Sequence, residues 1–133
     1  MNTTDPVADL LTRIRNASKA KRNAVDIPAS NLKREIVRIL QESKYVKDMV
    51  ELPDNKQGIL RVYLQYAKGD TPVIKGIERI SRPGLRKYVD ATELRLSTHN
   101  SRGIMVVSTS RGILTNHEAA KMGIGGEVML RCW

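Results

Sequence analysis

Residues 106–127 read VVSTSRGILTNHEAAKMGIGGE, and the expected fold is organised around this stretch. The apolar run at 104–107 ends at three hydroxyl side chains at 108–110, after which Arg111 and Gly112 turn the chain. The pattern predicts a strand that delivers hydroxyl groups and an arginine to a loop tip. A loop of this composition is typical of a surface that contacts a partner.

A short capped helix is predicted directly after this loop. Thr115 and Glu118 fit a capping box, in which each side chain satisfies a backbone amide of the other residue. Gly123 is placed to end the helix in a left-handed conformation. Gly125 and Gly126 lack side chains, so another surface can approach the backbone closely there. The helix would therefore brace the loop.

The charge of the chain favours a polyanionic partner. The 133 residues carry a net charge of +9, with a pI near 10.0. Residues 1–66 hold 12 basic and 8 acidic side chains, and the remainder hold 11 and 6, so both halves are basic. Nucleic acid is the first candidate partner and an anionic membrane surface the second. Aromatic residues make up only 4%, which favours folded RNA over stacked single-stranded bases.

Cysteine content and hydropathy indicate a reducing, aqueous compartment. Cys132 is the single cysteine, which excludes an internal disulfide framework. No apolar run approaches the roughly 20 residues that a membrane helix needs. The N-terminal residues lack the basic start and apolar core of a signal peptide. We therefore expect a cytoplasmic protein, or one in the equivalent compartment of an organelle.

The first half predicts a helix, a strand, a second helix and a hairpin. Asp5 and Pro6 suit the start of the first helix, and a short strand is expected at 24–27. Ser30 or Asn31 can cap the second helix, with Lys33 off its apolar face. The expected faces are Val7, Leu10, Leu11, Ile14 and Ala17 in the first helix and Leu32, Ile36, Ile39 and Leu40 in the second. The hairpin is expected at 45–52 and 59–66.

The second half predicts mostly antiparallel sheet. Strands are expected at 73–80 and 85–89 around a type II turn at Pro83 and Gly84. Residues 90–97 fit either a loop or a strand, residues 99–103 form a turn, and a last strand covers 127–133. The fold class is therefore α+β with two small domains. These are an α-β-α-β-β unit at 1–66 and a mostly antiparallel β unit with one short helix at 67–133.

The residue types do not support an enzyme, a cofactor or a metal site. His117 and Glu118 begin like a zinc-binding H-E-x-x-H helix, but Lys121 occupies the fifth position. The glycines at 123–126 follow a helix rather than a strand, which is the wrong order for a dinucleotide loop. Ser110 and His117 lack an evident buried carboxylate to orient the histidine. We expect a non-catalytic binding protein without cofactors.

Three segments resemble one known family. These segments are TDPVADLLTRIRNA at the start, SRPGLRKY in the middle, and STSRGILTNHEA followed by GIGGEV near the end. Together they resemble small-subunit ribosomal protein number eight of the bacterial series. Two regions depart from the family pattern, namely the STHNSRG segment before Ile104 and the ending at 129–133.

The resemblance implies a structural component of the small ribosomal subunit. Such a protein is a primary binder of the central domain of small-subunit rRNA and helps assemble the platform. Its expected neighbours are small-subunit proteins five and twelve, with no membrane contact and no homo-oligomer. Alternative functions are a sequence-tolerant nucleic-acid chaperone, a translational repressor that binds an rRNA-like fold in mRNA, and an RNA-processing hydrolase.

The resemblance also implies a set of RNA-contacting residues at matching positions. The hydroxyl triplet is the principal contact, since hydroxyls can meet 2′-hydroxyls and base edges, while Arg111 attracts phosphate. For two of the residues that follow, Arg86 and Tyr88, a protein-facing or packing role fits equally well. The full set is Thr4, Asp5, Arg13, Arg15, Asn16, Ser30, Lys33, Arg86, Tyr88, Ser108, Thr109, Ser110, Arg111, Thr115, Gly125, Gly126 and Glu127.

Overall fold

The chain forms two compact units, each with its own sheet and helices. The computed structural model describes residues 5–100 and 102–133. Unit 2 comprises Pro6–Lys75, while unit 1 comprises Asp5 and Gly76–Trp133. The α+β class predicted from the sequence is confirmed. The division between the units lies between Lys75 and Gly76, beyond the boundary expected at 66/67.

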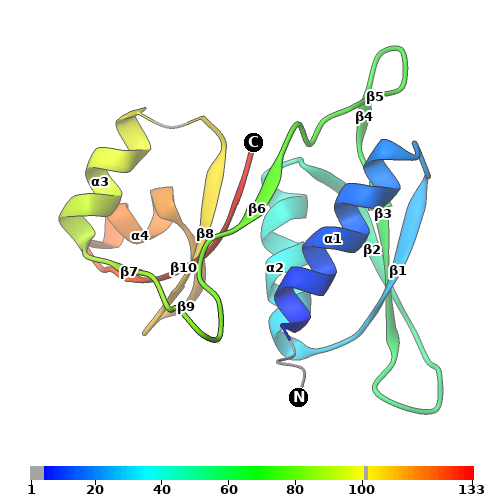
Figure 1. The fold of residues 1–133 in the computed structure, drawn as a ribbon, viewed down its shortest axis with the longest axis horizontal. Helices are drawn as coiled ribbons and strands as arrows, with labels where there is room; N and C mark the ends of the chain where they lie inside the picture. Colours follow the sequence, from blue (N-terminus) through cyan, green and yellow to red (C-terminus); the bar gives the residue numbers. More distant parts are fainter. Residues whose placement is uncertain (1–4, 101) are drawn as a thin grey trace. The chain divides into compact units, whose positions relative to one another are not determined.

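Unit 2 packs two helices against one side of a three-stranded antiparallel sheet (Figure 1). Its elements are α1 (Pro6–Lys19), β1 (Ala24–Pro28), α2 (Asn31–Glu42), β2 (Val46–Leu52), β3 (Ile59–Leu64), β4 (Tyr66–Ala67) and β5 (Thr71–Pro72). The order β1-β3-β2 places β3 in the centre. Alternate β3 residues Leu60, Val62 and Leu64 are buried, which confirms the predicted period of two.

The apolar face of α1 is as predicted, whereas that of α2 is rotated. All five residues expected on the α1 face are buried. On α2, Leu32 is exposed, and Lys33 and Val37 are buried together with Ile36, Ile39 and Leu40. The prediction that Lys33 lies off the face is therefore wrong. Its long aliphatic stem packs inward, as lysine stems often do.

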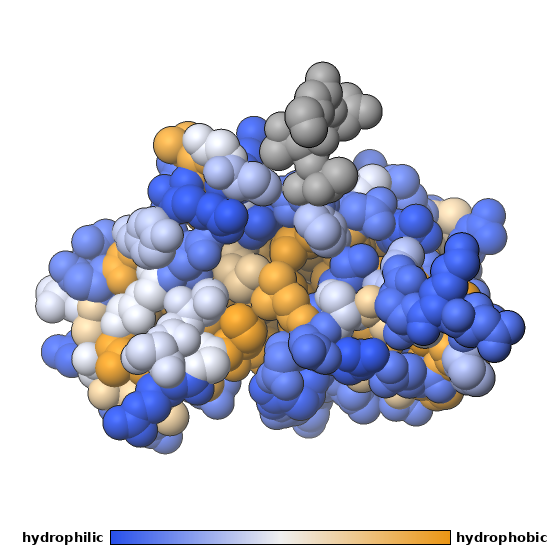
Figure 2. Space-filling view, turned by 90° about the horizontal axis from the view of Figure 1, so that it is seen from below, coloured by the Kyte–Doolittle hydropathy of each residue, from blue (hydrophilic) through white to orange (hydrophobic). Residues whose placement is uncertain are grey.

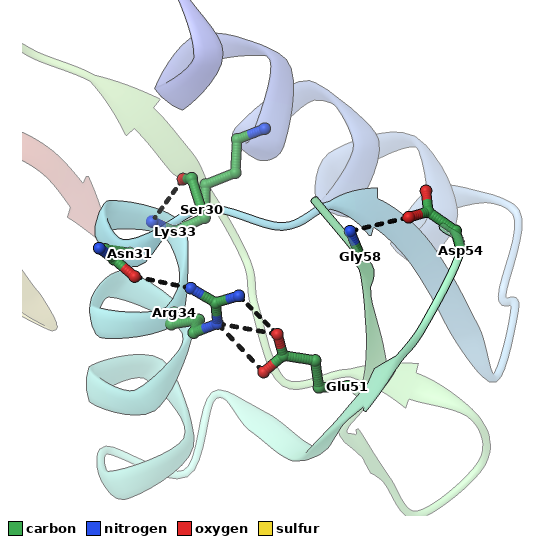
Figure 3. A network of polar contacts seen from close by, with 7 residues as sticks. All are labelled: Ser30, Asn31, Lys33, Arg34, Glu51, Asp54 and Gly58. Carbon is green, nitrogen blue, oxygen red and sulfur yellow. Dashed lines mark hydrogen bonds and ion pairs between the residues drawn. The ribbon is translucent and has the colours of Figure 1, made fainter. Parts of the chain in front are cut away.

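Polar contacts fix the turns around α2 (Figure 3). Ser30 caps the helix by accepting a hydrogen bond from the Lys33 amide at 3.2 Å. Arg34 binds both carboxylate oxygens of Glu51 on β2, and so ties the helix to the sheet. Asp54 accepts from the Gly58 amide at 2.8 Å and closes the β2–β3 turn. These contacts cap α2, link it to β2 and close the turn between β2 and β3.

Lysines occupy the left-handed positions that end both helices of unit 2. Lys21 has φ +54° and Lys44 has φ +66°. After α2, the Lys44 amide donates to Gln41 O and the Tyr45 amide donates to Leu40 O, the pattern of a Schellman motif. Glycine normally fills this position because a Cβ is strained there.

Unit 1 is a five-stranded antiparallel sheet with two helices on one face (Figure 1). Its elements are β6 (Ile77–Arg79), β7 (Tyr88–Val89), α3 (Ala91–Asn100), β8 (Ile104–Thr109), β9 (Gly112–Thr115), α4 (Asn116–Met122) and β10 (Gly126–Cys132). The order is β6-β10-β8-β9, and β7 also pairs with β10. Leu94 of α3, Val107 of β8 and Ala119 of α4 form the buried cluster between the helices and the sheet.

Helix α3 corrects the interpretation of residues 90–97 as a loop or a strand. Asp90 caps this helix by accepting from the Glu93 amide at 2.8 Å. Unit 1 therefore has two described helices rather than one. The strands expected at 73–80 and 85–89 shrink to β6 and β7. The expected type II turn at Pro83–Gly84 is also wrong, because the φ of Gly84 is outside the left-handed region that such a turn requires.

Candidate nucleic-acid interface

The hydroxyl-rich stretch forms a tight hairpin between β8 and β9. Thr109 pairs with Gly112, which leaves Ser110 and Arg111 alone in the exposed turn. The Thr109 hydroxyl donates to Gly112 O at 2.8 Å and accepts from the Arg111 amide at 3.0 Å. Gly112 has φ +100°, which glycine adopts without strain. The turn therefore projects one hydroxyl and one guanidinium, and the Thr109 side chain holds their backbone.

Ser108 is on the sheet face opposite the two helices. Val107 packs against α3 and α4, so the next side chain along the strand points to the other side. Ser108 pairs with Ile113 on β9 and with Glu127 on β10, and Glu127 pairs with Tyr88 on β7. Directly opposed residues share a face. One row across the sheet thus carries the polar side chains of Ser108, Glu127 and Tyr88.

Two glycines let other segments of the same chain approach closely. A Cβ on Gly126 would be 2.2 Å from Ser108 O, and one on Gly125 would be 2.3 Å from Val89 O. Real Cβ atoms essentially never come so near. The surface that approaches these glycines is therefore the chain's own backbone. Gly125 and Gly126 therefore allow β10 to pack closely against β8 and against the end of β7.

Helix α4 begins immediately after the hairpin, as expected. The Thr115 hydroxyl accepts from the Glu118 amide at 3.1 Å, and Glu118 accepts from the Thr115 amide at 3.2 Å. Gly123 ends the helix with φ +69°. The predicted capping box and helix end are confirmed. Thr115 is buried and occupied by this cap, so its position indicates a supporting role.

Glu127 is held by a buried serine and an exposed arginine. Its Oε2 accepts from the Ser81 hydroxyl and, at 3.0 Å, from Arg86 Nη1. Burial disfavours the charged form, but the hydrogen bonds from Ser81 and Arg86 outweigh it and hold the pKa of Glu127 below its ordinary value. Glu127 therefore stays ionised and anchors the start of β10.

The segment 82–88, which we call the 82–88 arm, is exposed along its whole length. Leu85 is 62% exposed and Tyr88 is 69% exposed. Reciprocal backbone hydrogen bonds of 3.0 and 2.9 Å between Arg82 and Leu85 close the arm. Three cations, Arg82, Arg86 and Lys87, accompany Leu85 and Tyr88, and the arm contains no acidic residue. The arm offers an attractive surface to a polyanion.

Unit 2 contributes a separate cleft of about 640 Å³ between α1 and β1. Arg13, Asn16, Arg22, Asp26 and Arg61 are among its lining residues. Arg61 binds both oxygens of Asp26, at 2.8 and 3.1 Å, while Arg13 binds Asp9 and the Asp26 carbonyl. Three arginines and one aspartate leave the lining net positive. The guanidinium of Arg61 lowers the pKa of Asp26, so the aspartate stays charged.

The remaining candidate residues are scattered. Thr4 lies outside the described residues. Asp5 forms an ion pair with Arg79 at 3.1 Å, with only 17% of its side chain exposed. Arg15 is half-buried on α1 and is not among the residues that line the cleft. Lys33 is 6% exposed, and its Nζ donates to Pro28 O at 3.1 Å. Ser30 is engaged as the α2 cap.

Sequence reasoning missed Ser81 and the Asp26–Arg61 pair. Asp26 and Arg61 meet because β1 pairs with β3, and a single sequence gives no direct signal for that register. Ser81 precedes a turn, where serine is common, so its burial had no visible sign. Both became apparent only from the three-dimensional arrangement.

Other kinds of site receive little support from the geometry. Within residues 5–100 and 102–133, no three or more His, Cys, Asp or Glu side chains gather where a metal ion could bind. In the part of the chain that the structure describes, no helix has the length and apolar character needed to cross a membrane. Figure 2 shows one face, on which hydrophilic residues cover much of the surface.

Comparison with known proteins decides the family. Residues 5–133 match the family described as Ribosomal protein S8. The chain is 51% identical over 133 residues, and over the full length of both proteins, to small ribosomal subunit protein uS8 of Natranaerobius thermophilus. The corresponding protein of Ligilactobacillus salivarius is 50% identical over 130 residues, 98% of each chain, and that of Staphylococcus aureus is 45% identical over the full length of both. The chain belongs to the ribosomal protein S8 family.

Membership of the S8 family confirms two expectations from the sequence. The resemblance carried by the three segments is confirmed across nearly the whole chain. The S8 family consists of structural, non-enzymatic proteins, so the expectation that the chain is not an enzyme is also confirmed. The departures at 97–103 and 129–133 do not prevent the match, which extends to Trp133.

Proposed function

We propose that the chain is a primary rRNA-binding protein of the small ribosomal subunit. It binds the central domain of the small-subunit rRNA and helps assemble the platform beside small-subunit proteins five and twelve in the cytoplasm. Family membership supports the coarser statement that it is a structural component of that subunit. The net charge of +9 supports attraction to RNA in both units.

One observation carries the finer proposal, namely the braced β8–β9 turn. Ser110 and Arg111 are exposed there, Thr109 fixes their backbone, and Gly126 packs against Ser108 from behind. A rigid turn loses little conformational freedom on binding, so its contacts contribute more fully to affinity. Hydroxyl groups suit 2′-hydroxyls and base edges, and the guanidinium suits phosphate.

The proposal assigns contacts that depend on the RNA sequence and shape to Ser110, and attraction to phosphate to Arg111. Ser110→Ala should weaken binding to the specific RNA by about 1 to 3 kcal/mol if an RNA partner is left unsatisfied, and should leave binding to an unrelated duplex unchanged. Arg111→Ala should weaken binding to both RNAs and reduce the logarithmic salt slope by about 1. Arg38→Ala is the matched control, because Arg38 is paired with Glu35 and Glu42 on α2.

The experiment is a filter-binding titration at several salt concentrations. A central-domain rRNA fragment and an unrelated RNA duplex are the two probes. The proposal expects preference for the fragment and affinity that falls as salt rises. Equal affinity for both probes would favour a sequence-tolerant chaperone, and salt-independent binding would overturn the electrostatic part. Loss of the protein from small subunits after a moderate-salt wash would contradict a structural role.

A further inference from the structure

The buried hydroxyl of Ser81 lies at the base of the exposed 82–88 arm. Ser81 is 0% exposed, and its oxygen donates to Glu127 Oε2 while accepting from the Lys87 amide at 3.2 Å. We propose that Ser81 is a positioning residue for RNA binding, which acts through Glu127 to hold Arg86 and the arm in a fixed orientation. This inference rests on the proposed RNA-binding function and deepens it by adding a second, coupled contact surface.

The first step is the attachment of the arm to β10. The Ser81 amide donates to Val128 O at 3.1 Å, and the Val128 amide donates to Lys87 O at 3.0 Å. Ser81, just before the arm, and Lys87, near its end, are therefore bound to the same residue of β10. The Ser81 hydroxyl adds a third tie across the base of the arm, since it reaches the Lys87 amide. Three hydrogen bonds therefore hold the base of the arm, although the arm itself is exposed.

The second step is the sharing of one carboxylate oxygen. Ser81 and Arg86 both donate to Glu127 Oε2. Only 16% of the Glu127 side chain is exposed, compared with 48% of the Arg86 side chain. Without the Ser81 hydroxyl, the carboxylate would lose a buried donor and would gain by rotating toward water. Arg86 would then lose its fixed partner.

The third step links this orientation to binding. Arg86 uses Nη1 for Glu127, and a guanidinium has five N–H donors, so the others remain available to a phosphate. An arginine already held in place loses less rotamer freedom on binding than a mobile one. The backbone of Glu127 is also paired with that of Ser108, so the residue that holds Arg86 lies directly beside the hydroxyl strand. Ser81 thereby aligns two RNA-contacting surfaces.

A double-mutant cycle tests the proposal. Ser81→Ala, Arg86→Ala and the double variant are titrated with the rRNA fragment at several salt concentrations. If Ser81 acts through Arg86, Ser81→Ala should weaken binding roughly threefold or more and lower the salt slope toward that of Arg86→Ala. In the Arg86→Ala background, Ser81→Ala should then cause no further loss. A merely structural serine would change thermal stability without this non-additivity.

Ser97→Ala is the matched control. Its hydroxyl donates to Leu94 O within its own helix α3, in the same unit, so its removal should leave the salt slope unchanged. Additive losses, or a folded Ser81→Ala protein with unchanged affinity and slope, would overturn the proposal. If Ser81→Ala does not fold, Glu127→Gln replaces it in the same cycle. Additive losses of binding from Glu127→Gln and Arg86→Ala would also overturn the proposal. Failure of the unaltered protein to bind the fragment would instead contradict the proposed function.

Discussion

Ser108 on β8 is directly opposite Glu127 on β10, and the two side chains share the sheet face that points away from α3 and α4. Glu127 is in turn fixed by Ser81 and Arg86. The residue paired with Ser108 therefore carries an ionised carboxylate that Ser81 and Arg86 hold in place. Conditions that discharge this carboxylate should loosen the start of β10, where it pairs with β8.

The first prediction concerns pH. The folded-state pKa of Glu127 lies below its ordinary value of 4.5, so the stabilisation is complete above about pH 4.5 and is lost as the pH falls through the folded-state pKa. Glu127→Gln should therefore lower the free energy of unfolding by about 1 to 3 kcal/mol at neutral pH. The difference from the unaltered protein should shrink in acid. Urea denaturation at several pH values measures it, and a pH-independent difference would contradict the assignment.

The second prediction compares two glycines of the interface. Gly126→Ala places a Cβ 2.2 Å from Ser108 O and should cost about 3 kcal/mol, because β8 and β10 must separate. Gly112→Ala meets no atom within 4 Å, and its cost of about 1 to 2 kcal/mol comes from the positive φ alone. Chemical denaturation ranks the two variants. The reverse order would mean that the turn, rather than the strand contact, is the stricter constraint.

The third prediction concerns the end of α2. Lys44→Gly should stabilise the protein by up to about 1 kcal/mol, because glycine adopts φ +66° without a Cβ clash. Lys19→Gly is the control, since Lys19 is in the last turn of α1 and glycine there should cost about 1 kcal/mol. Both changes remove one positive charge, so thermal unfolding separates conformation from charge. Equal effects would show that the lost charge dominates.

The fourth prediction concerns Lys33. Lys33→Ala removes a buried stem and the donor to Pro28 O, so it should destabilise the protein by about 1 to 3 kcal/mol. The salt slope of RNA binding should stay unchanged, because the ammonium is directed to a carbonyl of its own chain. Lys47→Ala, an exposed change on β2, is the control for stability. If Lys33→Ala reduced the logarithmic salt slope of RNA binding by about 1, Lys33 would instead be a phosphate contact.

Local signals predicted much of the fold. The Thr115–Glu118 capping box, the Gly123 helix end and the α1 face depend on neighbours within one or two turns, and all are confirmed. Helix α3 was missed because, among residues 91–97, only Leu94 is fully buried, which gives no helical period. The cap at Asp90, three residues before Glu93, was the signal that could have revealed it.

Charge was the misleading signal at Lys33. A cation is usually assigned to a solvated face, whereas here the aliphatic stem is buried and Leu32 is exposed instead. The site was predictable where it depends on the hairpin itself, as at Ser110 and Arg111. The role of Ser81 in holding Glu127 was not predictable, since it depends on a contact between residues far apart in the sequence.

The order of strands has a consequence for synthesis. Pro6–Lys75 contains the partners of all its own strands, so its three-stranded sheet can form as soon as β3 has emerged. In unit 1, by contrast, β6, β7 and β8 all pair with β10, the last strand of the chain. The nascent chain must therefore keep these strands unpaired with β10 until residues 126–132 have been made. A stalled or shortened product would carry a finished first sheet and open strand edges in the second, the kind of edge that promotes aggregation.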